Sequence, residues 1–163
     1  MASGVKVADG VKELFSQMKV VKNDADQMER IRLVVLSICG EFIDVEKIYR
    51  EKDLKDKDVF KVYMSELKPK TCRYILYDCH FETKESSKKE ELVFVLWCPD
   101  ESNIKEKMCY ASSKDALKAI LKSGVKHDLQ INDLSDCGDR DSFGKKLGPT
   151  LIKVEGHPVT ITP

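Results

Sequence analysis

The longest periodic pattern of apolar and polar positions in the chain lies between residues 101 and 124. Ser102 suits an N-cap and Gly124 suits a helix stop, so the pattern predicts a helix between these two residues. At about 100° per residue, one side of this helix collects apolar positions. We predict that this side packs against the domain, and it contains Cys109, Tyr110, Ala116, Leu117, Ile120 and Leu121.

The opposite side of the predicted helix mixes apolar residues with lysines. Ile104 and Met108 lie there, next to alanines and charged positions. A flexible methionine among small residues, with a basic rim, is typical of a helix that binds in the groove of a partner. A surface helix that carries stray apolar residues would show the same spacing. The pattern alone leaves both interpretations open.

Other segments predict strands mixed with shorter helices. Asp9 suits the N-cap of a first helix, whose inner face carries Val11, Leu14, Phe15 and Met18. A second helix is predicted over residues 59–67, ahead of Pro69, and a weak last helix over 136–146, where Gly138 and Gly144 interrupt the pattern. The predicted strands are residues 32–38, 42–49, 72–81, 92–98, 128–134 and 150–155.

The order of these elements indicates the fold class. The β-branched run at residues 32–38 is typical of a central strand, and residues 42–49 complete a hairpin with it. Residues 19–27 and 50–58 are expected to be connections, and residues 82–91 a long charged hairpin loop. Because strands and helices intermix without a βαβ repeat, we predict an α+β domain with a mixed sheet flanked by helices.

Composition and charge limit the classes of function. The 163 residues are expected to form one domain, and the 28 positive and 28 negative side chains create no global attraction to nucleic acid or membranes. No signal segment or membrane span is predicted. The six cysteines show no metal-ligand spacing. We expect Cys39, Cys79, Cys98 and Cys109 to act as small, reduced hydrophobic residues.

No catalytic constellation is visible in the sequence. The three histidines are far apart, and none accompanies a nucleophile in a known pattern. The scattered glycines form neither a P-loop nor a dinucleotide-binding pattern. We therefore expect an interaction protein, not an enzyme, without a cofactor or metal.

Several motifs carry a resemblance that covers nearly the whole chain. They are MASGVKVADGV at the N-terminus, CRYILYD at 72–78, FETKESSKKEELVFVLWCPDE at 81–101, MCYASSKDALK at 108–118 and KLG at 146–148. Together they resemble the actin-depolymerising factor/cofilin family. The resemblance implies the actin-depolymerising-factor homology fold, a mixed five- or six-stranded sheet with helices on both faces, over residues 1–163 with a flexible regulatory tail at 1–8.

The resemblance also implies two actin-binding surfaces. One surface engages monomeric actin and one filament subunit, and its residues here are Ser3, Gly4, Val5, Lys105, Lys107, Met108, Ser113 and Lys114. The other engages the neighbouring filament subunit through Lys88, Lys89, Asp139, Arg140, Lys145 and Lys146. Family members prefer ADP-actin, change the filament twist, sever filaments and depolymerise them. The two glycines near the last helix leave a second interpretation open, a module that binds monomers or filament sides without severing.

Regulation is implied by the same resemblance. Ser3 matches a phosphorylation site, so a protein kinase and a phosphatase are expected partners, and a phosphate there would oppose actin binding through its charge. Phosphoinositide lipids are expected inhibitors, and their candidate ligands are Lys105, Lys107, Lys126 and His127. His127 is also a candidate for pH dependence.

The expected setting is a cytoplasmic monomer on the actin cytoskeleton. Vertebrate relatives carry a lysine-rich nuclear import run before the first strand, where this chain has only Arg30 and Arg32. Nuclear import by that route is therefore not expected.

Overall fold

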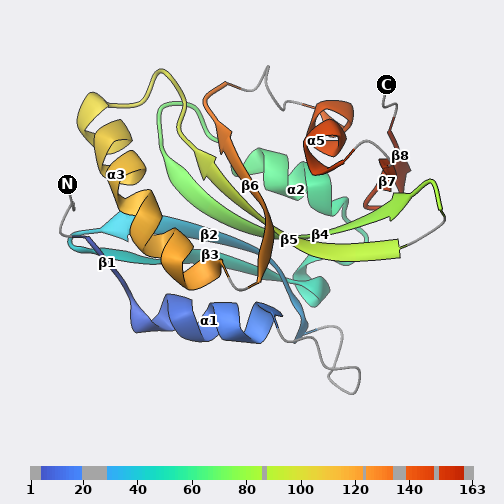
Figure 1. Ribbon diagram of the computed structural model, residues 1–163, viewed down its shortest axis with the longest axis horizontal. Coiled ribbons are helices and arrows are strands. Elements are labelled where there is room, and N and C mark those ends of the chain that lie inside the picture. The colour runs from blue at the N-terminus through green and yellow to red at the C-terminus, as the bar shows by residue number, and fades with distance from the viewer. Residues whose placement is uncertain are drawn as a thin grey trace.

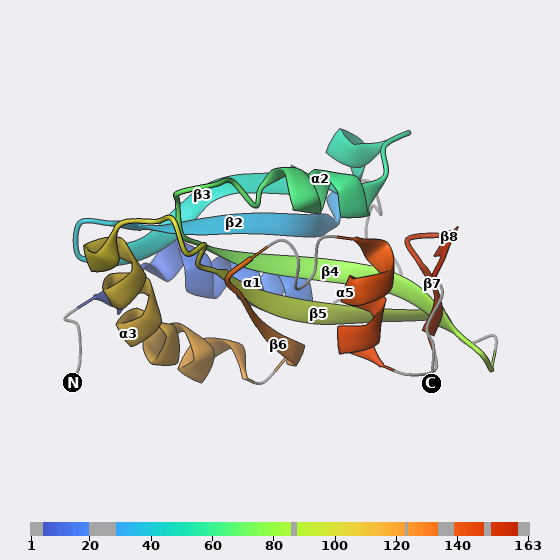
Figure 2. The same ribbon diagram turned by 90° about the horizontal axis from the view of Figure 1, so that it is seen from above.

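The computed structural model describes residues 5–19, 29–85, 88–122, 124–133, 139–148 and 151–159. One mixed sheet forms its centre, and helices cover both faces (Figures 1 and 2). The strands are β1 (Lys6–Val7), β2 (Ile31–Cys39), β3 (Phe42–Arg50), β4 (Arg73–Thr83), β5 (Lys88–Trp97), β6 (Val125–Ile131), β7 (Leu151–Val154) and β8 (His157–Pro158). The helices are α1 (Asp9–Lys19), the short 3-10 helix η2 (Glu51–Leu54), α2 (Val59–Ser65), α3 (Ile104–Leu121) and α5 (Arg140–Leu147).

The strand order explains why some strands are apolar throughout. The main path is β1-β3-β2-β4-β5-β6, with β7 paired to β4 and β8 to β7. The β1/β3 and β5/β6 pairs are parallel, and the other pairs are antiparallel. Since β2 lies inside this path, residues 31–36 are all buried, which confirms the predicted central strand. Within the described residues the sheet has eight strands, more than the five or six expected, because two-residue strands extend it.

Two hydrophobic cores lie on opposite faces of the sheet. The first joins α1 and α3 to the sheet, with Phe15, Tyr110 and Leu117 among its buried residues. The predicted inner face of α1 is confirmed, because all four of its apolar residues are buried in this core. The second core joins α2 and α5 to the other face. Side chains of β4 point alternately to the two faces of the sheet, so this strand contributes to both cores. Tyr74 lies in the first core and Tyr77 in the second.

An aromatic cluster organises the second core. Tyr63 of α2 stacks on Tyr77 of β4, with ring centroids 5.1 Å apart. Phe143 of α5 lies 5.3 Å from Tyr63 and 5.3 Å from Phe60. These contacts fix both short helices against the sheet.

The long segment forms a helix, α3, as predicted, but its ends and part of its buried face differ from the prediction. Asn103, not Ser102, is the N-cap: its side chain accepts a hydrogen bond from Lys105 N at 2.8 Å. Ser102 is buried and donates to Pro99 O at 2.5 Å instead. Ala116, expected in the core, is exposed, and Ser113 takes an inner position because the helix contacts the sheet along Tyr110, Ser113, Leu117 and Leu121.

The charged segment at residues 82–91 is mostly strand. Glu82 pairs with Lys88 and His80 with Glu90 across β4 and β5, so only residues 84–87 separate the two strands, and of these the structure describes 84 and 85. Opposite charges on the facing Glu82 and Lys88 stabilise this pairing, and Phe81 of the same ribbon is buried in the second core. The expected long loop was therefore wrong.

The described segments near both ends of the chain contain more regular secondary structure than expected. Residues 6–7, assigned to a flexible tail, form β1, and residues 1–4 lie outside the described residues. Gly144, expected to interrupt the last helix, lies buried inside α5, while Gly138 and residues 20–27 of the predicted loop are outside the described residues. None of the helices in the described part of the chain has the length and apolarity needed to cross a bilayer.

Candidate functional site

The outer face of α3 is the most exposed apolar surface that the structure describes. Ile104 is 73% exposed and Met108 is 67% exposed. They are four residues apart, so they lie on one face of the helix, one turn from each other. Exposed Lys105 and Ala111 continue this surface. We call Ile104, Lys105, Met108 and Ala111 the α3 face.

Hydrogen bonds to the sheet fix α3 on its inner side. The Tyr110 hydroxyl accepts a hydrogen bond from Ile38 N at 2.9 Å, and the Tyr74 hydroxyl donates to the Tyr110 carbonyl. Near the N-terminus of α3, Glu106 Oε1 accepts from Cys72 N at 2.7 Å. Burial raises the pKa of both tyrosines, which keeps them neutral hydrogen-bonding groups. The α3 face is therefore presented by a fixed element and not by a loop.

The predicted contact residues on α3 do not all point outward. Lys107 Nζ donates to Asp100 O at 3.1 Å, and Lys114 Nζ lies 3.6 Å from an oxygen of Asp128. Lys118, which was not predicted, forms the shorter contact with Asp128, at 2.6 Å. Ser113 is only 1% exposed, so its side chain supports helix packing and cannot form a direct partner contact.

The N-terminal residues approach the same surface. Val5 is half-buried against the first core, and β1 packs beside α3 (Figure 2). Ser3 and Gly4 lie outside the described residues.

The second predicted surface lies at the end of the sheet where β4 enters its hairpin. Lys88 and Lys89 are exposed at the start of β5. Strand β7 pairs with β4 at Phe81–Thr83, and α5 packs on β7. Exposed Lys145 and Lys146 occupy the last turn of α5. The structure therefore places both parts of the predicted filament surface at one end of the sheet.

Two residues predicted for that surface serve the fold. Asp139 is the N-cap of α5, and its Oδ1 accepts from Ser142 N at 2.7 Å. That backbone hydrogen bond lowers the pKa of Asp139. Arg140 forms an ion pair with Asp58, donates to Val154 O at 3.1 Å and lies 4.7 Å above the Phe60 ring. Burial alone would raise the pKa of Asp58, but the Arg140 guanidinium, His157 and the Phe60 backbone amide together hold it below its usual value.

The predicted phosphoinositide ligands form two separate groups. Lys105 and Lys107 lie in the first turn of α3, whereas Lys126 and His127 follow its end, on β6. The helix between them separates the groups by about 20 Å or more. His127 Nε2 is 3.0 Å from Glu91 Oε1 on the neighbouring strand. One lipid headgroup cannot reach both groups, whereas an extended membrane surface can.

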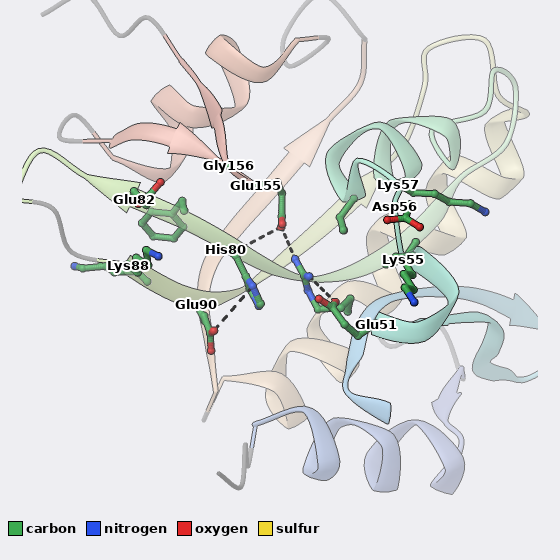
Figure 3. Close-up of a pocket in the computed structure, with 15 residues that line it drawn as sticks. Glu51, Lys55, Asp56, Lys57, His80, Glu82, Lys88, Glu90, Glu155 and Gly156 are labelled. Carbon is green, nitrogen blue, oxygen red and sulfur yellow. Dashed lines mark hydrogen bonds and ion pairs between the residues drawn. The ribbon is translucent and has the colours of Figure 1, made fainter. Parts of the chain in front are cut away.

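Sequence reasoning missed a cavity of about 580 Å³ between η2 and the β4–β5 hairpin (Figure 3). Its floor is a buried charge network. Arg32 Nη1 lies 2.7 Å from Glu51 Oε2, and Arg32 Nη2 lies 2.5 Å from Glu155 Oε1, which also accepts from the Tyr77 hydroxyl at 2.9 Å. Burial lowers the pKa of Arg32, but Glu155 and Glu51 raise it further, so the guanidinium stays charged. The only sequence signal was the charged segment at 50–58, interpreted as a connection.

The described residues contain no group of three or more potential metal ligands that could hold a metal ion. What the structure offers instead is an exposed apolar and basic helix face on a rigid sheet, with a second basic region at the far end of that sheet. Such an arrangement is typical of a protein-interaction domain.

Comparisons with known proteins give the family. The sequence model of the cofilin/tropomyosin-type actin-binding proteins matches residues 4–148. The chain belongs to this family and is an actin-binding protein, which confirms the resemblance seen in its motifs.

Solved structures share the fold along most of the chain. The cofilin of Streptomyces griseoflavus is 28% identical over 87% of this chain and 98% of its own, with a TM-score of 0.70. Actin depolymerization factor 2 of Plasmodium berghei is 29% identical over 83% of this chain and 92% of its own, with a TM-score of 0.70. The ADF-like UNC-60A protein of Caenorhabditis elegans is 26% identical over 91% of this chain and 96% of its own, with a TM-score of 0.71.

Proposed function

We propose that this protein binds actin monomers and filaments, prefers ADP-actin, and severs and depolymerises filaments. The observation that carries the proposal is the α3 face, where Ile104 and Met108 are exposed on a fixed helix. Central, exposed apolar residues with charged neighbours have the anatomy of an interface in which a few residues supply most of the binding energy. Lys105 and Lys107 flank them and would steer an acidic partner.

Severing follows if the protein holds two neighbouring subunits at once. The α3 face binds one subunit, and Lys88, Lys89, Lys145 and Lys146 bind the next. If both contacts form only when the subunits are rotated from their relaxed positions, the protein shifts the filament to that twist, since a ligand favours the state that it binds better. Contacts between subunits then weaken. Severing and the loss of subunits from filament ends are the result.

The test combines cosedimentation with ADP-actin filaments and filament length by microscopy. The variant Lys105→Ala/Lys107→Ala should lose binding and shortening together. Its matched control is Lys61→Ala/Lys68→Ala, which removes two exposed lysines from the α2 side of the sheet. The control should bind and shorten filaments like wild type. Wild-type protein that binds neither form of actin would contradict the proposal.

A second candidate function is binding without severing. Asp139 and Arg140 form contacts within the fold, which leaves the second surface with fewer side chains for a partner. This observation favours binding without severing. Wild-type protein that cosediments with filaments but leaves their length unchanged would support this function in place of severing.

We further propose that phosphorylation of Ser3 inhibits actin binding. The polypeptide enters the described structure at Val5, beside α3, so a phosphate at Ser3 acts close to the α3 face. A charge of about −1.5 to −2 would repel an acidic partner. Ser3→Glu should weaken monomer binding, whereas Ser3→Ala should not.

Phosphoinositide membranes are the proposed competing partner. Because the two basic groups lie at opposite ends of α3, vesicles with phosphoinositide headgroups should bind more tightly than a single soluble headgroup. His127→Ala, compared across pH 6 to 8, tests the contribution of His127 to that binding.

A further inference from the structure

The cavity beside η2 is bordered by four lysines from two separate parts of the chain. Lys55 and Lys57 lie on the connection between η2 and α2, and Lys88 and Lys89 lie at the start of β5. Figure 3 shows Lys88 on the hairpin side and Lys55 and Lys57 on the opposite side, with His80 and Glu155 between them. The four side chains are exposed.

The carboxylates around this cavity are already engaged. Arg32 binds Glu51 and Glu155, and Arg30 Nη2 lies 2.8 Å from Glu90. Lys153 is 3.9 Å from Glu82. Within the residues that the structure describes, none of the four bordering lysines forms an ion pair. The lining contains five basic and five acidic side chains, and its acidic side chains other than exposed Asp56 are ion-paired, so the positive charge without an ion-pair partner lies on these four lysines.

The turn that carries Lys55 and Lys57 is held in one conformation. Asp56, between them, has a φ of 64°, which non-glycine residues rarely adopt. Lys57 N donates to Leu54 O at 2.9 Å, and Leu54 and Val59 are buried on either side of the turn. A left-handed residue is retained where the surrounding structure enforces it, often at binding sites. The turn therefore presents its two lysines in a defined direction.

We propose that Lys55 and Lys57, together with Lys88 and Lys89, form one cationic docking surface for an acidic segment of the neighbouring filament subunit. This inference rests on the proposed function, in which Lys88 and Lys89 face that subunit. It adds the η2–α2 connection to the surface and makes the cavity the place where a protruding acidic segment binds. The cavity is open and has lysines on both walls, so an inserted segment contacts both pairs at once.

The test measures filament binding for three double variants and wild type at two salt concentrations. Lys55→Ala/Lys57→Ala should weaken filament binding by about 3- to 30-fold and reduce its salt dependence. Lys88→Ala/Lys89→Ala should do the same. The control Lys61→Ala/Lys68→Ala removes the same charge outside the cavity and should bind like wild type. Binding to actin monomers, through the α3 face, should stay unchanged in all three.

The outcomes separate this inference from the function that it extends. If Lys88→Ala/Lys89→Ala weakens filament binding and Lys55→Ala/Lys57→Ala does not, the docking surface is wrong and the proposed function stands. If wild type does not bind filaments, the proposed function itself fails. A small polyanion is the alternative occupant of the cavity, and calorimetry with inorganic tripolyphosphate in the absence of actin tests for it. Micromolar binding that both cavity variants lose, but the control keeps, would identify a site for a small polyanion and overturn the proposal.

Discussion

At the scale of single residues, Met108 is the residue that we expect to contribute most to actin binding. It is 67% exposed on a fixed helix, so its replacement by a polar residue removes little packing within the fold. Met108→Glu should weaken binding to monomeric actin by about 30-fold or more, because a carboxylate replaces a central apolar contact. Fluorescence titration with labelled actin measures this change.

The matched control for Met108 is Ile48→Glu, an exposed apolar residue on β3, away from the α3 face. It should bind actin like wild type. Thermal unfolding should show similar stability for both variants. Equal loss of binding in the two variants would mean that Met108 has no special role.

The cysteines give a second prediction at this scale. Cys39 is exposed and Cys109 is half-buried, which corrects their expected role as core hydrophobic residues, whereas Cys72, Cys79 and Cys98 are buried. Burial raises the pKa of Cys72 to about 12; the Ser102 hydroxyl lowers it, and the neighbouring Cys98 thiol, 3.4 Å away, raises it. At pH 8 the Cys72 thiol therefore stays protonated, and a protonated thiol is a poor nucleophile.

Iodoacetamide should therefore label Cys39 rapidly and leave Cys72 unmodified until the protein unfolds. Mass spectrometry of the labelled peptides measures both rates. In concentrated guanidinium chloride the two rates should become similar. Rapid labelling of Cys72 in native protein would contradict the buried site.

At the scale of elements, α5 shows how a weak helical sequence becomes ordered. Its eight residues include Gly144, which has low helix propensity. The Asp139 cap, the Phe143 ring in the aromatic cluster and the ion pair from Arg140 to Asp58 compensate for this. Tertiary contacts, rather than local preference, form this helix.

Arg140→Ala should lower the free energy of unfolding by about 2–3 kcal/mol, because it leaves the Asp58 carboxylate without its main partner. Urea unfolding measures the change. Lys145→Ala, on the exposed side of the same helix, should cost less than about 0.5 kcal/mol and serves as the control. A similar loss in both variants would assign the effect to helix propensity instead of the ion pair.

The elements also show what the sequence can and cannot predict. Strands β2, β4 and β5 were found because their apolar runs are long, and α3 because its period is regular. The links between Arg140 and Asp58, 82 positions apart, and between Arg32 and Glu155, 123 positions apart, leave no local pattern. The same limit explains why the contact of Arg140 within the fold and the cavity were both missed.

At the scale of the whole molecule, a charge network joins the strands at one end of the sheet. Arg30 Nε lies 2.8 Å from Asp78 Oδ2, and His80 Nε2 lies 3.5 Å from Asp78 Oδ1. Burial would raise the pKa of Asp78, but His80 and Arg30 lower it to below its usual value.

Because the pKa of Asp78 is lowered by folding, its contribution to stability is complete above about pH 4 and is lost as the pH falls through the lowered value. Asp78→Asn should lower the free energy of unfolding by about 3 kcal/mol at pH 7 and make stability less dependent on pH below 4. Urea unfolding between pH 2 and 7 tests this. Glu41→Gln, on an exposed turn, should retain the acid dependence of wild type. An unchanged acid slope in Asp78→Asn would show that other carboxylates dominate.

The contact between Arg32 and Glu155 determines where this domain ends. The family match stops at residue 148, yet the buried guanidinium in the second strand needs a carboxylate seven residues further on. A recombinant fragment of residues 1–148 should lose at least about 3–5 kcal/mol of folding free energy, because it would bury Arg32 without that partner. Full-length Glu155→Gln separates the lost charge from the lost strands. We therefore expect the smallest unit that folds to be longer than the segment by which the family is recognised, so that domain boundaries drawn from family similarity alone would separate Arg32 from Glu155.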